Sequence, residues 1–242
     1  MTAETRPAFY ALARGGWRDY VTLLHPPYTL WHLSYVVIGA ALAPPWYPGR
    51  LGATLVAFFL AVGIGAHALD ELRGRPLGTR IPATTLAWLA AVSIGAAIGI
   101  GIAGAIAFDL WLLVFVAAGA ILVLAYNLEL FGGRLHTDVW FALAWGAFPL
   151  LTAYFACAGR LHVEAIAAAA FAALTSYAQR RLSSPVRRLR REVASVSGTV
   201  ELADGSREPV TRETLIAGNE VALRALSAAM VALAVALVVL RS

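Results

Sequence analysis

The chain contains no lysine, only one cysteine and little charge for its length. All 19 basic residues are arginines, which excludes a retinal photoreceptor, because its Schiff base needs a lysine amine. The single Cys157 excludes an intrachain disulfide and a cysteine-rich metal site. Charged residues make up 14% of the chain, against about a quarter in soluble domains. Because 60% of the 242 residues are hydrophobic, we expect the bilayer to be the solvent of the folded chain.

Long apolar runs divide the sequence into segments of roughly the length of a membrane-spanning helix, about 20 residues. Charge or turn residues separate these runs, which cover residues 29–47, 51–69, 84–103, 110–127, 139–158, 163–180 and 221–240. The sequence therefore predicts an all-α, polytopic membrane bundle of about seven transmembrane helices in a single domain. Within it we expect a polar arm over residues 1–27, a six-helix core over 28–180, a basic loop over 181–219 and a last spanning helix over 220–242.

The arginines are distributed unevenly between the predicted loops. If the N-terminus is cytoplasmic, only Arg50, Arg160 and Arg241 fall on the outer side, and nearly all others fall on the inner side. The positive-inside rule favours this orientation. We therefore predict a multi-pass protein of the cytoplasmic membrane, with its N-terminus inside and its C-terminus outside.

An ionisable cluster follows the second apolar run, in the stretch "GIGAHALDELRGRPLGTRIP" from Gly63 to Pro82. On a helix, His67, Asp70 and Glu71 are spaced i, i+3 and i+4, so they share one face at the predicted inner membrane edge. Carboxylates with one imidazole can hold a divalent cation, and nearby arginines can bind phosphate oxygens in bidentate fashion. The pattern favours a metal-bridged diphosphate site. The alternative is an ordinary solvated loop.

Three stretches together resemble the UbiA superfamily of intramembrane prenyltransferases: "HPPYTLWHLSYVVIGAALAP", "AHALDELRGRPLGTRIP" and "AYNLELFGGRLHTDVWFALAWGAFPLLTAYFACAG". In that family an aspartate motif and an Arg-Pro follow the second helix, and a later helix carries Gly-x-x-Pro. Arg75-Pro76 match the Arg-Pro, which puts Asp70 near the second aspartate of the motif, and Gly146 and Pro149 match the later pattern. The resemblance covers roughly residues 28–159.

The resemblance implies transfer of an isoprenyl group from a diphosphate donor to an acceptor, with Mg²⁺ ionising the diphosphate. On this hypothesis the catalytic and metal-binding residues are His67, Asp70 and Glu71. The residues expected to bind the diphosphate of an isoprenoid or other lipid are Arg73, Arg75, Arg80, Tyr126, Asn127 and Arg134.

The sequence also departs from the family pattern. His67 replaces one aspartate, Gly74 stands where a further acid often lies, and about seven helices replace the usual nine. The second aspartate-rich motif is missing, and "SYAQRRLSSPVRRLRREV" is basic instead. Two alternatives to the enzyme therefore stay open: a non-catalytic UbiA-derived protein that binds or transports a lipid phosphate, and a structural subunit of a membrane complex.

The arginine-rich segment from Arg180 to Arg191 has two interpretations. Each arginine near an anionic membrane surface contributes about 1 kcal/mol, so docking on anionic lipids is favoured. Alternatively, Arg180, Arg187 and Arg188 fold back over a phosphate-bearing ligand. Nucleic acid is not expected, because no aromatic residues alternate with these arginines.

Two local signals predict structure at the inner end of the chain. Thr137 and Asp138 are typical of a helix N-terminus, although Asp138 could instead supply an acid to the site. Further on, the alternation around Val200 and the turn at 203–206 predict a small β-hairpin, followed by a capped helix from about Thr211.

Overall fold

The computed structural model describes residues 6–242, and nearly all regular structure in this part is helical. In chain order the elements are α1 (Trp17–Leu23), α2 (Pro26–Leu42), α3 (Pro48–Phe58), η1 (Phe59–Ala66), α4 (His67–Leu72), α5 (Ala83–Ala107), α6 (Leu112–Asn127), η2 (Phe131–Gly133), α7 (Asp138–Ala142), η3 (Leu143–Ala147), α8 (Phe148–Ala158), α9 (Val163–Arg191), β1 (Thr199–Glu201), β2 (Arg207–Pro209) and α10 (Arg212–Arg241). The predicted helical class is therefore confirmed.

Four continuous helices are long and apolar enough to cross a membrane: residues Pro48–Leu72, Ala83–Ala107, Asp138–Ala158 and Arg212–Arg241. The first and third of these are built from α3–η1–α4 and α7–η3–α8. Helix α6, with 16 residues, is apolar but shorter. The count of seven spans and the inward N-terminus remain predictions.

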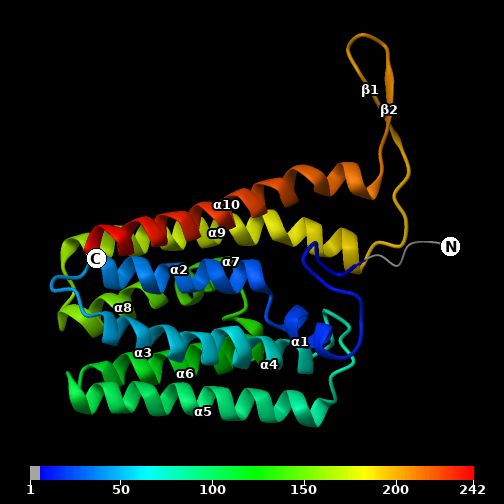
Figure 1. Ribbon diagram of the computed structural model, residues 1–242. Helices are drawn as coiled ribbons and strands as arrows, with labels where there is room; N and C mark the ends of the chain where they lie inside the picture. Colours follow the sequence, from blue (N-terminus) through cyan, green and yellow to red (C-terminus); the bar gives the residue numbers. More distant parts are fainter. Residues whose placement is uncertain (1–5) are drawn as a thin grey trace.

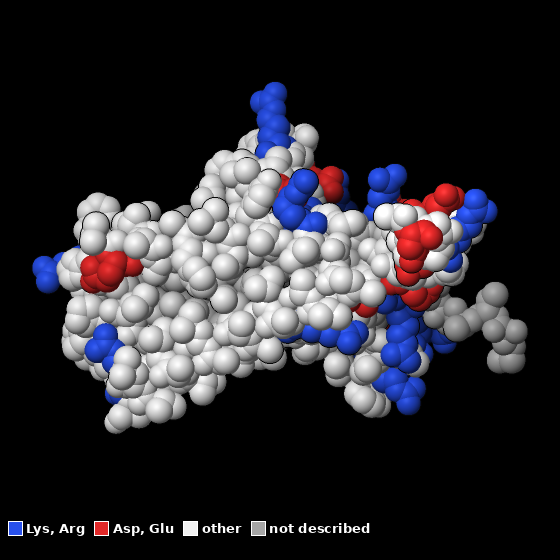
Figure 2. Space-filling view, turned by 90° about the horizontal axis from the view of Figure 1, so that it is seen from above, with Lys and Arg blue, Asp and Glu red and all other residues white. Residues whose placement is uncertain are grey.

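The helices lie side by side with roughly parallel axes, and the hairpin projects from the end where the chain begins (Figure 1). The C-terminus lies at the opposite end of the bundle (Figure 1). Charged side chains gather mainly toward the hairpin end, and a broad uncharged surface covers much of the rest (Figure 2). This separation of charge from apolar surface is what a bilayer environment requires.

Small residues let the central helices approach closely. A Cβ added at Gly39 of α2 would overlap the backbone carbonyl of Leu150 in α8, and one added at Gly146 would overlap the carbonyl of Ala172 in α9. Gly146 was matched to the UbiA pattern above. Here it brings η3 against α9, the helix that carries the arginine-rich segment.

Two π-helical segments interrupt the second and fifth long apolar runs. The segment η1 ends directly before His67, and η3 contains Trp145. A π turn inserts extra backbone into a helix and rotates the residues that follow, which is why such turns are often found at functional sites. Both segments carry or precede residues of the cavity described below.

The predicted basic loop over residues 181–219 is partly helical in the structure. Helix α9 continues without a break to Arg191, because arginine, leucine and serine maintain the helix and Pro185 interrupts only one backbone hydrogen bond. Residues 181–191 are therefore helical, and α10 already begins at Arg212. The predicted arm also contains the short helix α1.

The predicted hairpin and helix caps are confirmed. Strands β1 and β2 pair antiparallel, with Val200 opposite Glu208. Thr211 is the N-cap of α10, in a capping box with Thr214. Thr137 is the N-cap of α7, where its hydroxyl accepts the backbone N–H of Trp140.

Candidate functional site

A polar cavity of about 560 Å³, here called the polar chamber, lies at the hairpin end of the bundle. The N-terminal arm, the start of α2, helix α4, the end of α6 and the last turns of α9 form its walls. The ionisable and amide side chains on these walls are those of Tyr10, His25, Tyr28, His32, His67, Asp70, Tyr126, Asn127, Glu129, His136, Gln179, Arg180, Arg187, Arg188, Arg191 and Glu192. It therefore combines imidazoles, phenols and guanidiniums in one enclosed space.

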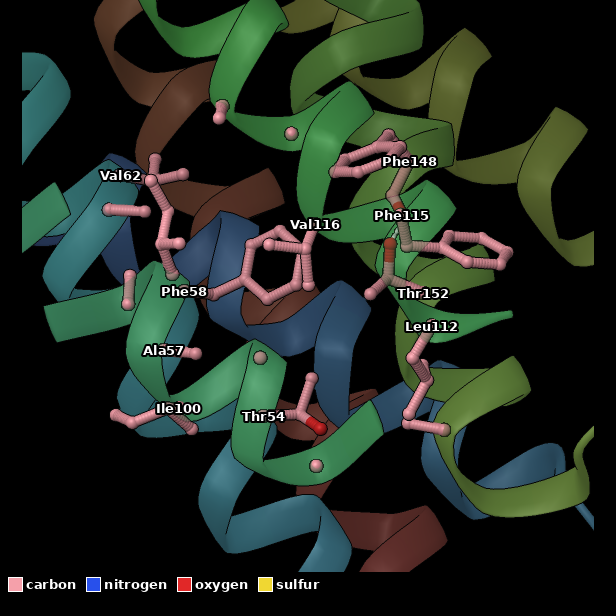
Figure 3. A pocket seen from close by; sticks show the side chains of 18 of the residues that line it. Thr54, Ala57, Phe58, Val62, Ile100, Leu112, Phe115, Val116, Phe148 and Thr152 are labelled. Carbon is pink, nitrogen blue, oxygen red and sulfur yellow. Dashed lines mark hydrogen bonds between the residues drawn. The ribbon is translucent and has the colours of Figure 1, made fainter. Parts of the chain in front are cut away.

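A second cavity, the apolar chamber, has a volume of about 140 Å³ and lies between α3, α5, α6 and α8. Figure 3 shows its lining, which is dominated by residues such as Phe58, Val62, Val116 and Phe148. Trp145 of η3 lines both chambers. A polar space and an apolar space thus meet at one side chain, an arrangement that suits an amphiphilic molecule.

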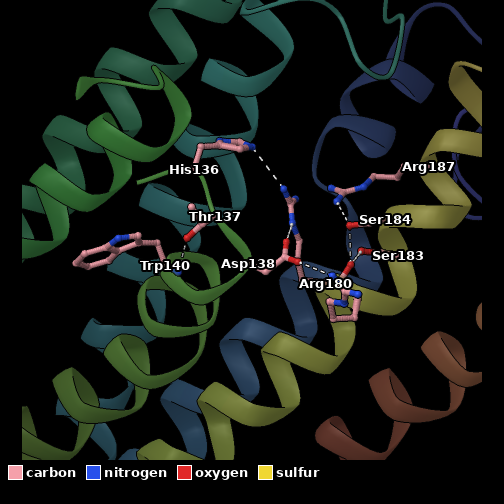
Figure 4. A network of polar contacts seen from close by, with 9 residues as sticks. His136, Thr137, Asp138, Trp140, Arg180, Ser183, Ser184 and Arg187 are labelled. Carbon is pink, nitrogen blue, oxygen red and sulfur yellow. Dashed lines mark hydrogen bonds and ion pairs between the residues drawn. The ribbon is translucent and has the colours of Figure 1, made fainter. Parts of the chain in front are cut away.

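The α9 wall of the polar chamber carries excess positive charge. Arg180 lies between Asp138 and His136: its Nε is 3.2 Å from the carboxylate, and its Nη2 donates to the imidazole over 3.4 Å (Figure 4). Arg181 also contacts Asp138, at 3.4 Å, but its side chain is 66% exposed and lies outside the chamber. The Asp138 carboxylate is therefore shared between two arginines.

Arg187 has no carboxylate partner among the described residues. Its guanidinium donates to the Ser184 hydroxyl at 3.2 Å (Figure 4). Burial, together with the neighbouring charges of Arg180 and Arg191, lowers the pKa of Arg187 to about 10, so the side chain remains charged at neutral pH. A shielded cation without a counter-ion is costly, and an anionic ligand would relieve that cost.

Imidazoles form the opposite wall. The rings of His25 and His67 stack with centroids 4.2 Å apart. His67 Nδ1 donates to the carbonyl of Gly63 at 3.1 Å, and His32 Nδ1 donates to the carbonyl of Trp145 at 2.8 Å. The Tyr10 hydroxyl is hydrogen-bonded to His25 Nδ1. Burial lowers the pKa of His25 well below its usual value, so this imidazole is uncharged at neutral pH.

Glu71 is not in the chamber, contrary to the sequence-based hypothesis. Its side chain is fully buried, and its carboxylate accepts hydrogen bonds from the backbone N–H groups of Leu77 and Thr79 and from the Thr79 hydroxyl, at 2.8–2.9 Å. These bonds fold the segment after α4 back onto the helix. Glu71 therefore anchors a loop, while His67 and Asp70 line the chamber.

The Mg²⁺ site predicted at His67, Asp70 and Glu71 does not fit the residues present. Asp70 has no hydrogen-bond or ion-pair partner in residues 6–242, but it is the only one of the two carboxylates that reaches the chamber. Among the described residues, no group of three or more His, Cys, Asp or Glu side chains is arranged to hold a metal ion. One carboxylate and one imidazole are a poor substitute for the octahedral oxygen ligands that Mg²⁺ prefers.

The four arginines expected to bind diphosphate lie outside the polar chamber. Arg73 pairs with Glu129 at 3.0 Å, and Arg75 donates to the carbonyls of Thr79 and Ile81 within its own loop. The side chains of Arg80 and Arg134 are exposed. The structure thus places the first two arginines in contacts with loops, and the guanidiniums at the chamber come from α9.

Tyr126 and Asn127, also expected at the site, line the chamber. Sequence reasoning missed Tyr10, Gln179 and the role of Arg191. A signal was present, since Arg180, Ser184, Arg187, Arg188 and Arg191 recur at helical spacing and share one face once the helix is extended.

Comparison with family models, curated proteins and solved structures finds no match to this chain. The fold and the site define an all-helical protein, with helices long enough to cross a membrane and a cationic chamber beside an apolar one. The resemblance to UbiA rests on the motifs quoted above.

Proposed function

We propose that the protein is a UbiA-like membrane protein that binds a lipid with a phosphate or diphosphate head group. The head group occupies the polar chamber against α9, and the hydrocarbon chain extends past Trp145 into the apolar chamber. The observation that carries this proposal is Arg187, a guanidinium without a carboxylate partner in the described chain, at a cavity that shares the lining residue Trp145 with an apolar cavity. Guanidinium groups bind phosphate oxygens through charge-assisted hydrogen bonds.

Native mass spectrometry of the protein, extracted gently from its membrane, tests this proposal. We expect the protein to retain a lipid that contains phosphate, and added isoprenyl phosphate or diphosphate to displace it. Retention only of lipids without phosphate, or no displacement, would contradict the proposal.

Prenyl transfer is the second candidate function, and an aromatic group at the junction of the chambers favours it. The rings of Tyr126 and Trp145 have centroids 4.6 Å apart, and Phe141 stacks on Trp145 at 5.9 Å. Aromatic faces stabilise cations, so this junction suits the allylic cation that forms when the bond between the prenyl carbon and the diphosphate breaks. The α9 arginines would then neutralise the departing diphosphate.

Measuring the release of inorganic diphosphate distinguishes a protein that only binds the lipid from one that transfers its prenyl group. Under the transfer hypothesis, the purified protein releases inorganic diphosphate from a bound isoprenyl diphosphate when an acceptor is present, and a metal chelator leaves much of this activity intact. Binding without release would leave the protein as a lipid-phosphate binding or transport protein.

The proposed position of the hydrocarbon chain in the apolar chamber can be tested with a larger side chain that narrows this cavity. We expect Ala120→Phe, on the chamber-facing side of α6, to weaken binding of a long-chain lipid phosphate about tenfold, because the ring fills space needed by the chain. Binding of inorganic diphosphate, which has no chain, should not change. Ala117→Phe, on the exposed side of the same helix, is the matched control. Equal effects of both variants on the lipid would show that its chain lies elsewhere.

A further inference from the structure

Three buried polar atoms of residues that line the polar chamber have no hydrogen-bond partner within residues 6–242. They are Nε2 of His25 before α2, the Tyr126 hydroxyl of α6 and Oε1 of Gln179 in α9. The three residues are 9%, 6% and 3% exposed. Native proteins rarely leave such atoms unpaired, because each costs the loss of its hydrogen bonds to water.

A phosphate group cannot satisfy all three atoms. Gln179 Oε1 is an acceptor and needs a donor, whereas an ionised phosphate offers only acceptors. The chamber is also far larger than one phosphate needs, since its 560 Å³ falls within the range of about 300–1,000 Å³ typical of complete small-molecule sites. Phosphate binding by the arginines explains the positive charge of the α9 wall but not the three unpaired atoms.

A hydroxyl group matches each of the three atoms. It donates to Gln179 Oε1, and it either donates to or accepts from the Tyr126 hydroxyl. His25 Nδ1 is occupied by Tyr10, and a hydroxyl pairs with Nε2 whether or not that nitrogen carries the ring proton. Several hydroxyls on one neutral group could reach all three atoms.

We propose that the head group of the lipid carries, next to its phosphate, a neutral polyhydroxylated group such as a sugar in phosphodiester linkage. This group hydrogen-bonds to His25, Tyr126 and Gln179, while the phosphate lies against Arg187. The inference rests on the proposed function, because it names the kind of phosphorylated lipid that the chamber holds.

The test compares a polyprenyl phosphate with a polyprenyl phosphomannose of equal chain length, bound to the detergent-solubilised protein. We expect the phosphomannose lipid to bind at least tenfold more tightly. Tyr126→Phe and Gln179→Leu should each remove about tenfold of its affinity, and Gln179→Leu should leave that of the plain phosphate unchanged. Tyr177→Phe, which is exposed on α9 outside the chamber, is the matched control.

The melting temperature without lipid provides an independent readout. Because the Tyr126 hydroxyl is unpaired, Tyr126→Phe should leave the melting temperature unchanged or raise it, which also shows that the variant folds. Equal affinity for the two lipids, or a lower melting temperature of the lipid-free variant, would overturn the inference and leave the proposed function standing. Failure of both lipids to bind would reject both.

Discussion

Replacing Arg187 with alanine is expected to weaken binding of a phosphorylated lipid about 100-fold, or about 2.7 kcal/mol. The guanidinium makes a charge-assisted hydrogen bond in a shielded site, where such bonds contribute about 1.5–3 kcal/mol. Its side-chain hydrogen-bond partner in the described chain, the Ser184 hydroxyl, is neutral, so the positive charge is available to the ligand. Titration with a fluorescent or isotope-labelled isoprenyl phosphate measures the effect.

The control for this prediction comes from the same helix. Arg181 is exposed and contacts Asp138 outside the chamber, so Arg181→Ala should change affinity less than twofold or threefold. Arg187→Lys keeps the charge but loses the planar pair of donors, and we expect it to recover only part of the affinity. If Arg181→Ala weakens binding as much as Arg187→Ala, the arginines attract the lipid through overall surface charge and the polar chamber is not the site.

The helices were largely predictable from sequence because their signals are local. Apolar run length, the prolines around position 45 and the caps at Thr137 and Thr211 each depend on residues close in the chain. The end of α9 was not predicted, because a run of arginines was interpreted as a solvated loop. Arginine is a good helix former, and the run continues the helix into the chamber wall.

The site was only partly predictable, because its geometry depends on contacts between distant segments. Helical spacing places His67, Asp70 and Glu71 together, yet Glu71 is buried against backbone donors of the following loop. No sequence pattern reveals that competition, nor the π segments η1 and η3 that rotate the residues of the site. The stacking of His25 on His67 joins the residue before α2 to the first residue of α4 and is likewise visible only in three dimensions.

Mutation of the neighbouring carboxylates Asp70 and Glu71 should affect the free energy of unfolding very differently. We expect Glu71→Ala to lower the free energy of unfolding by about 3–5 kcal/mol, because two buried backbone N–H groups and the Thr79 hydroxyl lose their acceptor. Glu71→Gln should lower the free energy of unfolding by less than Glu71→Ala does, since the amide keeps one acceptor oxygen but turns an NH₂ group toward a backbone donor. Thermal and denaturant unfolding in detergent measure both variants.

Asp70→Asn provides the contrast on the adjacent residue. The Asp70 carboxylate makes no hydrogen bond or ion pair within residues 6–242, so this change should leave the free energy of unfolding nearly unaltered while changing the charge of the chamber. A metal-ligand role for both residues predicts a different result. Mg²⁺ would raise the melting temperature of the unmodified protein, and substitution of either Asp70 or Glu71 would remove that increase. If the stability of the Glu71 variants matches that of Asp70→Asn, Glu71 does not anchor the loop and its assignment to the ligand site has to be reopened.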